Sequence, residues 1–131
     1  MGTVTENARA GYEDFNSHDF ESLLARMTED FTWEEAPEVP GPQSVTSREG
    51  FAHYLRSFDE FWERFRFEVV ETAETEDTLY ARIILHGRGK RSGADVELEI
   101  HHVWRLRDSR FASMRAYLDE GEARAAAGVG P

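Results

Sequence analysis

Cysteine is absent from the 131 residues of this sequence, so a disulfide framework, a thiolate zinc site and a thiol nucleophile are excluded. Histidine could supply metal ligands instead, but a metal site needs about three protein ligands. The five histidines show neither HxH nor HxxxH spacing. We therefore expect no metal and no bound cofactor. The lack of cysteine also fits a reducing compartment such as the cytoplasm.

Long apolar stretches and an excess of basic residues are also missing. No apolar run approaches the roughly 20 residues that a membrane span needs, and the opening MGTVTENARA lacks the basic and apolar regions of a signal peptide. The formal net charge is −11, and such a surface repels the phosphates of nucleic acids. We expect a soluble, cytoplasmic protein that binds neither nucleic acid nor a membrane.

The length and the 40% hydrophobic content suit one domain, residues 1–131, with a substantial core. Apolar residues at helical spacing predict three helices in the first half of the chain. The first covers about four turns from a capping box at Thr3, and the short second one reaches Met27. The third starts at another capping box at Thr46 and continues through Phe65.

The second half of the chain has the alternating pattern of strands. A first strand, Phe31 to Glu35, comes earlier and is followed by a loop over residues 36–47 with three prolines. The later strands are predicted at Phe67 to Thr72, Leu79 to Arg88, Asp95 to Arg107 and Phe111 to Leu118, before a last helix at Glu120 to Ala127. This order predicts an α+β domain with helices packed on one face of a curved sheet.

Two adjacent histidines, His101 and His102, lie in the predicted strand 95–107. Successive side chains of a strand point to opposite faces, so the two rings cannot bind one ion together. His102 shares its face with apolar residues such as Trp104. It is therefore either a core histidine held by a hydrogen bond or a polar group that lines a ligand pocket. His101 shares its face with charged residues, and we expect that face to meet solvent or a second subunit.

Glu35 is the second polar residue on a predicted interior face. It shares that face with Phe31 and Trp33, which are too large to leave in water. Glu35 would then lie at the mouth of the interior, where partial burial raises the pKa of a carboxylate and makes it a usable acid or base. The alternative is a glutamate at a strand end that turns out to solvent.

Several segments together resemble the SnoaL-like branch of the nuclear transport factor 2-like superfamily. They are a first helix that ends in YEDFNSHDFESLL, the strand FTWEEAP, the proline- and glycine-containing loop, the helix after it, HVWRLRD and RAYLDE. The resemblance covers about residues 4–127. It implies a cone-shaped half-barrel in which a curved, mostly antiparallel sheet wraps around three N-terminal helices and encloses a small-molecule pocket. It also implies a homodimer, often formed through the outer sheet face; here that face would contain Glu97, Glu99, His101, Val103 and Arg105.

The resemblance places some catalytic positions and removes others. In ketosteroid-isomerase-like members the general-base carboxylate lies at the end of the first strand, and Glu35 occupies the matching position. Members that resemble limonene epoxide hydrolase use an arginine and two aspartates. This sequence has Ile100, His102 and Ala116 at those positions, so epoxide hydrolysis by that mechanism is disfavoured. The fold alone decides little, because it hosts many unrelated functions.

Three hypotheses about function remain open. The first is an enzyme that isomerises or cyclises an apolar carbonyl substrate by proton transfer, with Glu35 or His102 as base and the other one, or a tyrosine, as donor to the oxyanion. The second is a non-catalytic domain that binds a small ligand, and the third is a dimeric domain with a vestigial cavity. The expected substrate-binding residues are Tyr12, Trp33, Tyr54, Trp104, Met114, Ala116 and Leu118, of which the resemblance turns the last three inward.

Overall fold

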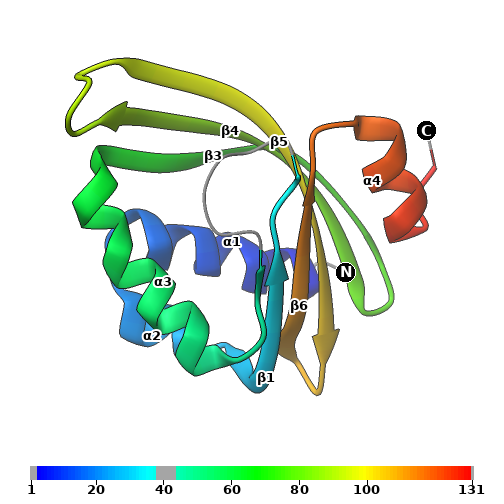
Figure 1. Cartoon of the computed structure of the whole chain (residues 1–131). Coiled ribbons are helices and arrows are strands. Elements are labelled where there is room, and N and C mark those ends of the chain that lie inside the picture. Colours follow the sequence, from blue (N-terminus) through cyan, green and yellow to red (C-terminus); the bar gives the residue numbers. More distant parts are fainter. Residues whose placement is uncertain (1–2, 38–43, 131) are drawn as a thin grey trace.

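The computed structural model of the chain describes residues 3–37 and 44–130. Three helices, α1 (Thr3–Asn16), α2 (Phe20–Ala25) and α3 (Arg48–Phe61), pack on the concave face of a strongly curved sheet (Figure 1). A fourth helix, α4 (Glu120–Ala127), lies on the opposite face. Among the residues described, none of the helices combines the length and hydrophobicity that spanning a membrane requires.

The sheet has six strands in the order β2-β1-β6-β5-β4-β3. Their bounds are β1 Met27–Glu34, β2 Ser44–Val45, β3 Trp62–Thr75, β4 Thr78–Gly89, β5 Asp95–Arg107 and β6 Arg110–Tyr117. All neighbours are antiparallel except β1 and β6, which run parallel. The predicted α+β class and the mostly antiparallel curved sheet are confirmed, although β1 joins the sheet beside the last strand rather than opening a simple meander.

The inner face of the sheet carries the main hydrophobic core. Trp33, Ile100, Trp104 and Met114 are all buried there against the three helices, as the alternation in the sequence predicts. The side chain of Asn16 fixes the end of α1 to the sheet, because its amide donates to Phe67 O at 2.8 Å and its oxygen accepts from Phe67 N at 2.9 Å. The core therefore lies between the helices and the concave sheet.

The junction between α3 and β3 differs from the prediction. The helix ends at Phe61, and Trp62 already begins β3, so Trp62 and Phe65 belong to a strand and not to the helix face. The indole of Trp62 lies against Gly87, where an added Cβ would stand 2.8 Å from an indole carbon. The corner therefore needs glycine at position 87.

Smaller differences concern the element ends. Ser47, and not Thr46, caps α3, since its hydroxyl accepts from Gly50 N. Met27 begins β1 rather than ending the second helix. The short strand β2 falls in the predicted loop over residues 36–47. Residues 38–43 of this loop lie outside the described part of the chain. The side chain of Thr3, with its predicted cap, also lies outside it.

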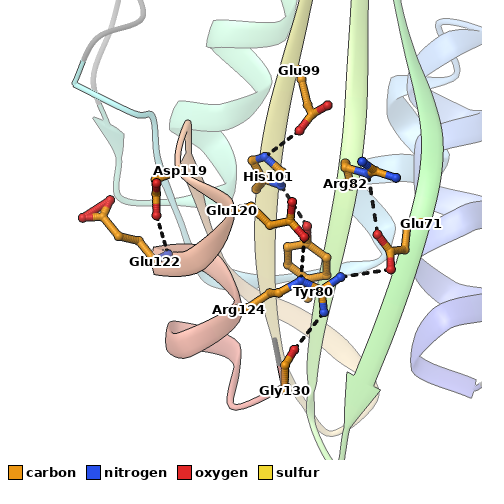
Figure 2. Close-up of polar contacts among 10 residues, drawn as sticks. All are labelled: Glu71, Tyr80, Arg82, Glu99, His101, Asp119, Glu120, Glu122, Arg124 and Gly130. Atoms are coloured by element: carbon orange, nitrogen blue, oxygen red, sulfur yellow. Dashed lines mark hydrogen bonds and ion pairs between the residues drawn. The ribbon is translucent and has the colours of Figure 1, made fainter.

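The outer face of the sheet is covered by α4, which corrects the prediction for His101. Ala123 and Ala127 of this helix pack on Tyr80 and Val103, and only 1% of His101 is exposed. Figure 2 shows the polar contacts around it. The His101 Nδ1 lies 2.9 Å from the Tyr80 hydroxyl, and Nε2 lies 3.0 Å from a carboxylate oxygen of Glu99. His101 is on the outer face as predicted, but it is buried within the chain instead of being exposed to solvent.

Candidate functional site

A cavity of about 60 Å³ lies between the three helices and the concave face of the sheet. Its lining is aromatic and aliphatic, apart from the ionisable side chains of Tyr12, Glu35, Tyr54 and His102. Neither lysine nor arginine is among the described residues that line it. Within residues 3–37 and 44–130, no three histidine, aspartate or glutamate side chains are arranged to hold a metal ion. The chemistry available at this site is therefore acid–base and hydrogen-bonding chemistry.

A buried hydrogen-bond chain crosses the inner part of the cavity. Trp104 of β5 donates its indole Nε1–H to the Tyr12 hydroxyl at 2.8 Å, and this hydroxyl lies 2.6 Å from His102 Nδ1. Helix α1 supplies the tyrosine, and β5 supplies the other two residues two positions apart on the same face. The chain joins segments that are 90 residues apart in the sequence.

The donors in this chain determine the tautomer of His102. Indole nitrogen can only donate, so the Tyr12 oxygen accepts from Trp104. We assign the Tyr12 proton to the bond with His102 Nδ1, because the hydroxyl has no other acceptor among the described residues. Burial, and to a smaller extent the neighbouring His101, lowers the pKa of His102 to about 3, so the ring is neutral and carries its proton on Nε2. Among the described residues, Nε2–H has no hydrogen-bond partner, and His102 lines the cavity. This N–H is available to an acceptor on a ligand.

Tyr12 is not a proton donor to a ligand in this arrangement. Its hydroxyl proton is used by His102, and burial raises the pKa of Tyr12 far above its ordinary value. The prediction that Tyr12 contacts the pocket is consistent with its place in the lining. Its role in the geometry is to hold His102.

Glu35 follows directly after the last residue of β1 and lies at the edge of the cavity. It is half-buried, and its carboxylate accepts a hydrogen bond from Ala36 N at 3.0 Å. Burial raises the pKa of Glu35, and the hydrogen bond from Ala36 opposes this only in part. The pKa of the Tyr54 hydroxyl on α3 is also raised, first by burial and then by the negative charge of Glu35. The glutamate therefore lies at the mouth rather than turning fully to solvent.

Aromatic rings surround this mouth. The ring centroids of Trp33 and Tyr54 are 4.5 Å apart, and Phe51 lies 6.2 Å from Trp33 and 6.1 Å from Tyr54. Phe58 packs edge-on against Tyr54 at 4.7 Å. Tyr54 and Phe58 are half-buried, so part of the lining on α3 reaches the surface of the molecule.

Most of the predicted site residues meet at this cavity. Its lining contains Glu35, His102, Tyr12, Trp33, Tyr54, Trp104 and Met114. Ala116 is buried opposite His102 on β6 and Leu118 is half-buried, but neither lines the cavity. Phe51 and Phe58 also line the cavity. The sequence does not single them out, because they belong to the apolar face of the third helix and their spacing is the same as that of core residues. Nor does it indicate the chain through Tyr12, for which a single sequence contains no signal.

Comparisons with known proteins agree on the fold. The family model of the SnoaL-like domain matches residues 8–114. A crystal structure of a protein of unknown function from Burkholderia pseudomallei, described as NTF2-like, is 18% identical, with a TM-score of 0.80 over 97% of this chain and 98% of that one. No curated protein matches the sequence.

Two further solved structures were determined with small molecules. A protein named TerC, co-crystallised with polyporic acid, is 20% identical, with a TM-score of 0.78 over 92% of this chain and 94% of that chain. A protein from Catenulispora acidiphila with a ketosteroid isomerase-like fold, in complex with trimethylamine, is 16% identical, with a TM-score of 0.77 over 95% and 94% of the two chains. At these identities the likeness concerns the fold.

Proposed function

The chain belongs to the SnoaL-like domain family, and we propose that it moves a proton on a small, apolar carbonyl compound bound in the cavity. The observation that carries this proposal is the hydrogen-bond chain from Trp104 through Tyr12 to His102, which leaves a neutral Nε2–H donor at an otherwise apolar site. A carboxylate with a raised pKa, Glu35, lines the same cavity. A base and an oxyanion donor at one site are the two groups that enolisation requires.

The roles follow from the protonation states. Glu35 as carboxylate removes a proton from the carbon next to the carbonyl, and the electron pair of that C–H bond moves into the enolate. The enolate oxygen accepts the hydrogen bond from His102 Nε2–H. If the substrate has a double bond between its β- and γ-carbons, the enolate is conjugated with it. Glu35, now protonated, then returns the proton to the γ-carbon and the double bond moves to the α,β position, which isomerises the substrate with no change in its atoms. His102 is unsuited to be the base, because its pKa of about 3 and its bond to Tyr12 leave it no basic nitrogen.

The size of the cavity limits the substrate. Its volume of about 60 Å³ is well below the roughly 300–1,000 Å³ of ordinary ligand pockets. A larger substrate therefore needs the half-buried rings of Tyr54 and Phe58 to move when it binds.

The proposal is tested by deuterium exchange at the α-carbon of small ketones such as cyclopentanone, followed by proton NMR in heavy water. We expect the chain to accelerate exchange above buffer, and Glu35→Gln to abolish the acceleration. His102→Phe, which removes the donor, should reduce the rate about 10²–10³-fold, the usual effect of losing one oxyanion donor. Glu34→Gln is the matched control, because Glu34 is the neighbouring exposed glutamate. Exchange that is no faster than buffer, or that is unchanged in Glu35→Gln, contradicts the proposal.

A second candidate function is binding of a small ligand without turnover. The small volume favours it, as does the apolar Ala116 opposite His102 on the neighbouring strand. Mass spectrometry of the chain purified from cells under native conditions would detect a retained ligand. A retained ligand that is recovered unchanged after hours, with no exchange activity, supports this function over the first.

A further inference from the structure

The carboxylate of Glu35 has no cationic partner in the described part of the chain. Its hydrogen bond comes from the backbone N–H of the next residue, Ala36, and none of the ion pairs between the described residues includes it. The lining of the cavity, as far as residues 3–37 and 44–130 form it, contains no arginine or lysine. A half-buried carboxylate without a cation is unfavourable, since desolvation is not offset by pairing. A positively charged ligand would supply the missing partner.

The rings beside Glu35 are suited to the same kind of ligand. Trp33 and Tyr54 pack against each other with ring centroids 4.5 Å apart, and Phe51 lies 6.2 Å and 6.1 Å from them. A cation therefore cannot lie between Trp33 and Tyr54, but it can lie against the side of this pair that lines the cavity. The faces of aromatic rings attract cations, tryptophan most strongly, and aromatic cages are the usual receptors for methylated ammonium groups. Anionic ligands find the opposite environment, because a carboxylate and ring faces both repel them.

The negative charge of the whole molecule also favours binding of a positively charged ligand. A net charge of −11 raises the concentration of small cations near the surface and speeds their association. The small volume also favours a compact group, and a methylated ammonium consists of one nitrogen and a few methyl groups.

We propose that the mouth of the cavity binds a small alkylammonium group, with Glu35 as its counter-ion and Trp33 and Tyr54 as its aromatic wall. This inference rests on the proposed function only because both place a ligand in the same cavity. It adds a class of ligand: methylated ammonium compounds bind there and compete with a carbonyl substrate for Glu35, whereas carboxylates are excluded.

The test compares choline with 3,3-dimethylbutan-1-ol, in which a carbon replaces the charged nitrogen while the shape is kept. Binding to the full chain is followed by calorimetry and tryptophan fluorescence at constant ionic strength, with sodium chloride as the salt control. We expect choline to bind about tenfold more tightly than the neutral alcohol. Equal affinities for the two compounds, or no binding of choline, overturn the proposal.

Variants assign the binding to the proposed residues. Glu35→Gln should weaken choline binding about tenfold without changing the affinity for the alcohol, whereas the control Glu34→Gln should change neither. If Glu35→Gln does not fold, Tyr54 supplies the test. Tyr54→Leu should weaken choline binding severalfold, and Tyr54→Phe, which keeps the ring, should not. Choline binding that is unaffected by these substitutions overturns the assignment.

Failure of this inference is distinguishable from failure of the proposed function. Ketone exchange requires no affinity for choline, and choline binding requires no turnover. If choline inhibits ketone exchange competitively, both proposals hold at one site. Exchange without choline binding overturns only the alkylammonium proposal.

Discussion

His102 ties the stability of the fold to pH, because burial holds it neutral. Its folded-state pKa of about 3 lies below the ordinary value of 6.5, so the unfolded chain binds a proton between these values and the folded chain does not. The stabilisation is complete above pH 6.5 and is lost as pH falls toward 3. We expect the free energy of unfolding to decrease by about 1.4 kcal/mol per pH unit in this window, as measured by urea denaturation at several pH values.

A matched variant separates this effect from that of Glu35. The raised pKa of Glu35 has the opposite effect on the free energy of unfolding. Just above pH 4.5 the folded chain binds a proton at Glu35 more readily than the unfolded chain does, so this contribution falls as the pH rises. His102→Asn keeps an acceptor for the Tyr12 hydroxyl but does not titrate. The difference between the wild-type and variant curves should therefore show the histidine slope alone. Parallel curves for the two proteins would contradict a neutral, buried His102.

At the same scale, the placement of single residues was predictable and their partners were not. Alternation along one strand is enough to put His102 and Trp104 inside and His101 outside. The partner of His102, Tyr12, comes from a helix 90 residues earlier, and local periodicity contains no information about such a pair. The same holds for His101, whose cover by α4 depends on how a terminal helix docks.

At the scale of elements, Arg124 helps to fix α4 to the sheet, together with Thr75 and Arg105, whose side chains donate to Ala127 O and Ala126 O of the helix. The Nε of Arg124 lies 2.8 Å from Glu120 and its Nη2 lies 2.9 Å from Glu71 on β3. The guanidinium also lies 4.5 Å from the ring centroid of Tyr80 and donates to Gly130 O at 2.9 Å. Figure 2 draws the polar contacts of Arg124 as dashed lines. The apolar contacts of α4 come mainly from small alanine side chains, so these polar contacts determine whether the helix stays docked.

Replacing Arg124 should therefore loosen α4 and leave the rest of the fold intact. For Arg124→Met we expect backbone amides of α4 to exchange with solvent about tenfold faster, while amides of β4 and β5 keep their protection. Glu122→Gln, at an exposed position of the same helix, is the control and should not change exchange. Hydrogen exchange followed by NMR measures both, and equal protection of α4 in both variants would show that Arg124 is not needed to hold it.

The element boundaries show where pattern reading is insufficient. Trp62 and Phe65 continue the spacing of the α3 face, so periodicity alone extends the helix through them, yet the chain changes from helix to strand at Trp62 without a proline or glycine. Tertiary contacts decide this boundary, because β3 pairs with β4 from Trp62 opposite Gly89 onward. By contrast, α4 has the predicted bounds, since Gly128 ends it in a left-handed conformation with φ of 75°.

At the scale of the whole molecule, the excess of 26 acidic over 15 basic residues destabilises the compact state by self-repulsion. Salt screens this repulsion, so we expect the melting temperature to rise by a few degrees between about 0.02 M and about 0.3 M sodium chloride. Calorimetric scans measure the shift. Replacing two exposed glutamates, Glu21 and Glu60, by lysine should reduce this rise of the melting temperature with salt. A melting temperature that falls with salt would mean that the surface ion pairs outweigh the repulsion.

A homodimer remains a prediction. Helix α4 occupies the part of the outer face near Tyr80 and Val103, which removes these residues from any interface. The outer side of β1 and β6 stays open and forms a hollow with Thr32, Ser113 and Arg115 in its lining. A dimer formed through the sheet could use this side or the exposed outer face of β3 to β5 around Glu68, Glu97 and Glu99.

The parallel pairing of β1 with β6 has a consequence for the order in which the molecule is made. β2 contributes only two residues beside β1, so β1 depends for most of its length on a strand near the other end of the chain. During synthesis, most of the segment that leads to Glu35 cannot complete its pairing until β6, about 80 residues later, has been made. Contacts of such long sequence separation form slowly. The cavity therefore cannot be completed before β6 is made, and a nascent chain that stops before β6 contains both Glu35 and His102 but lacks the strand between them.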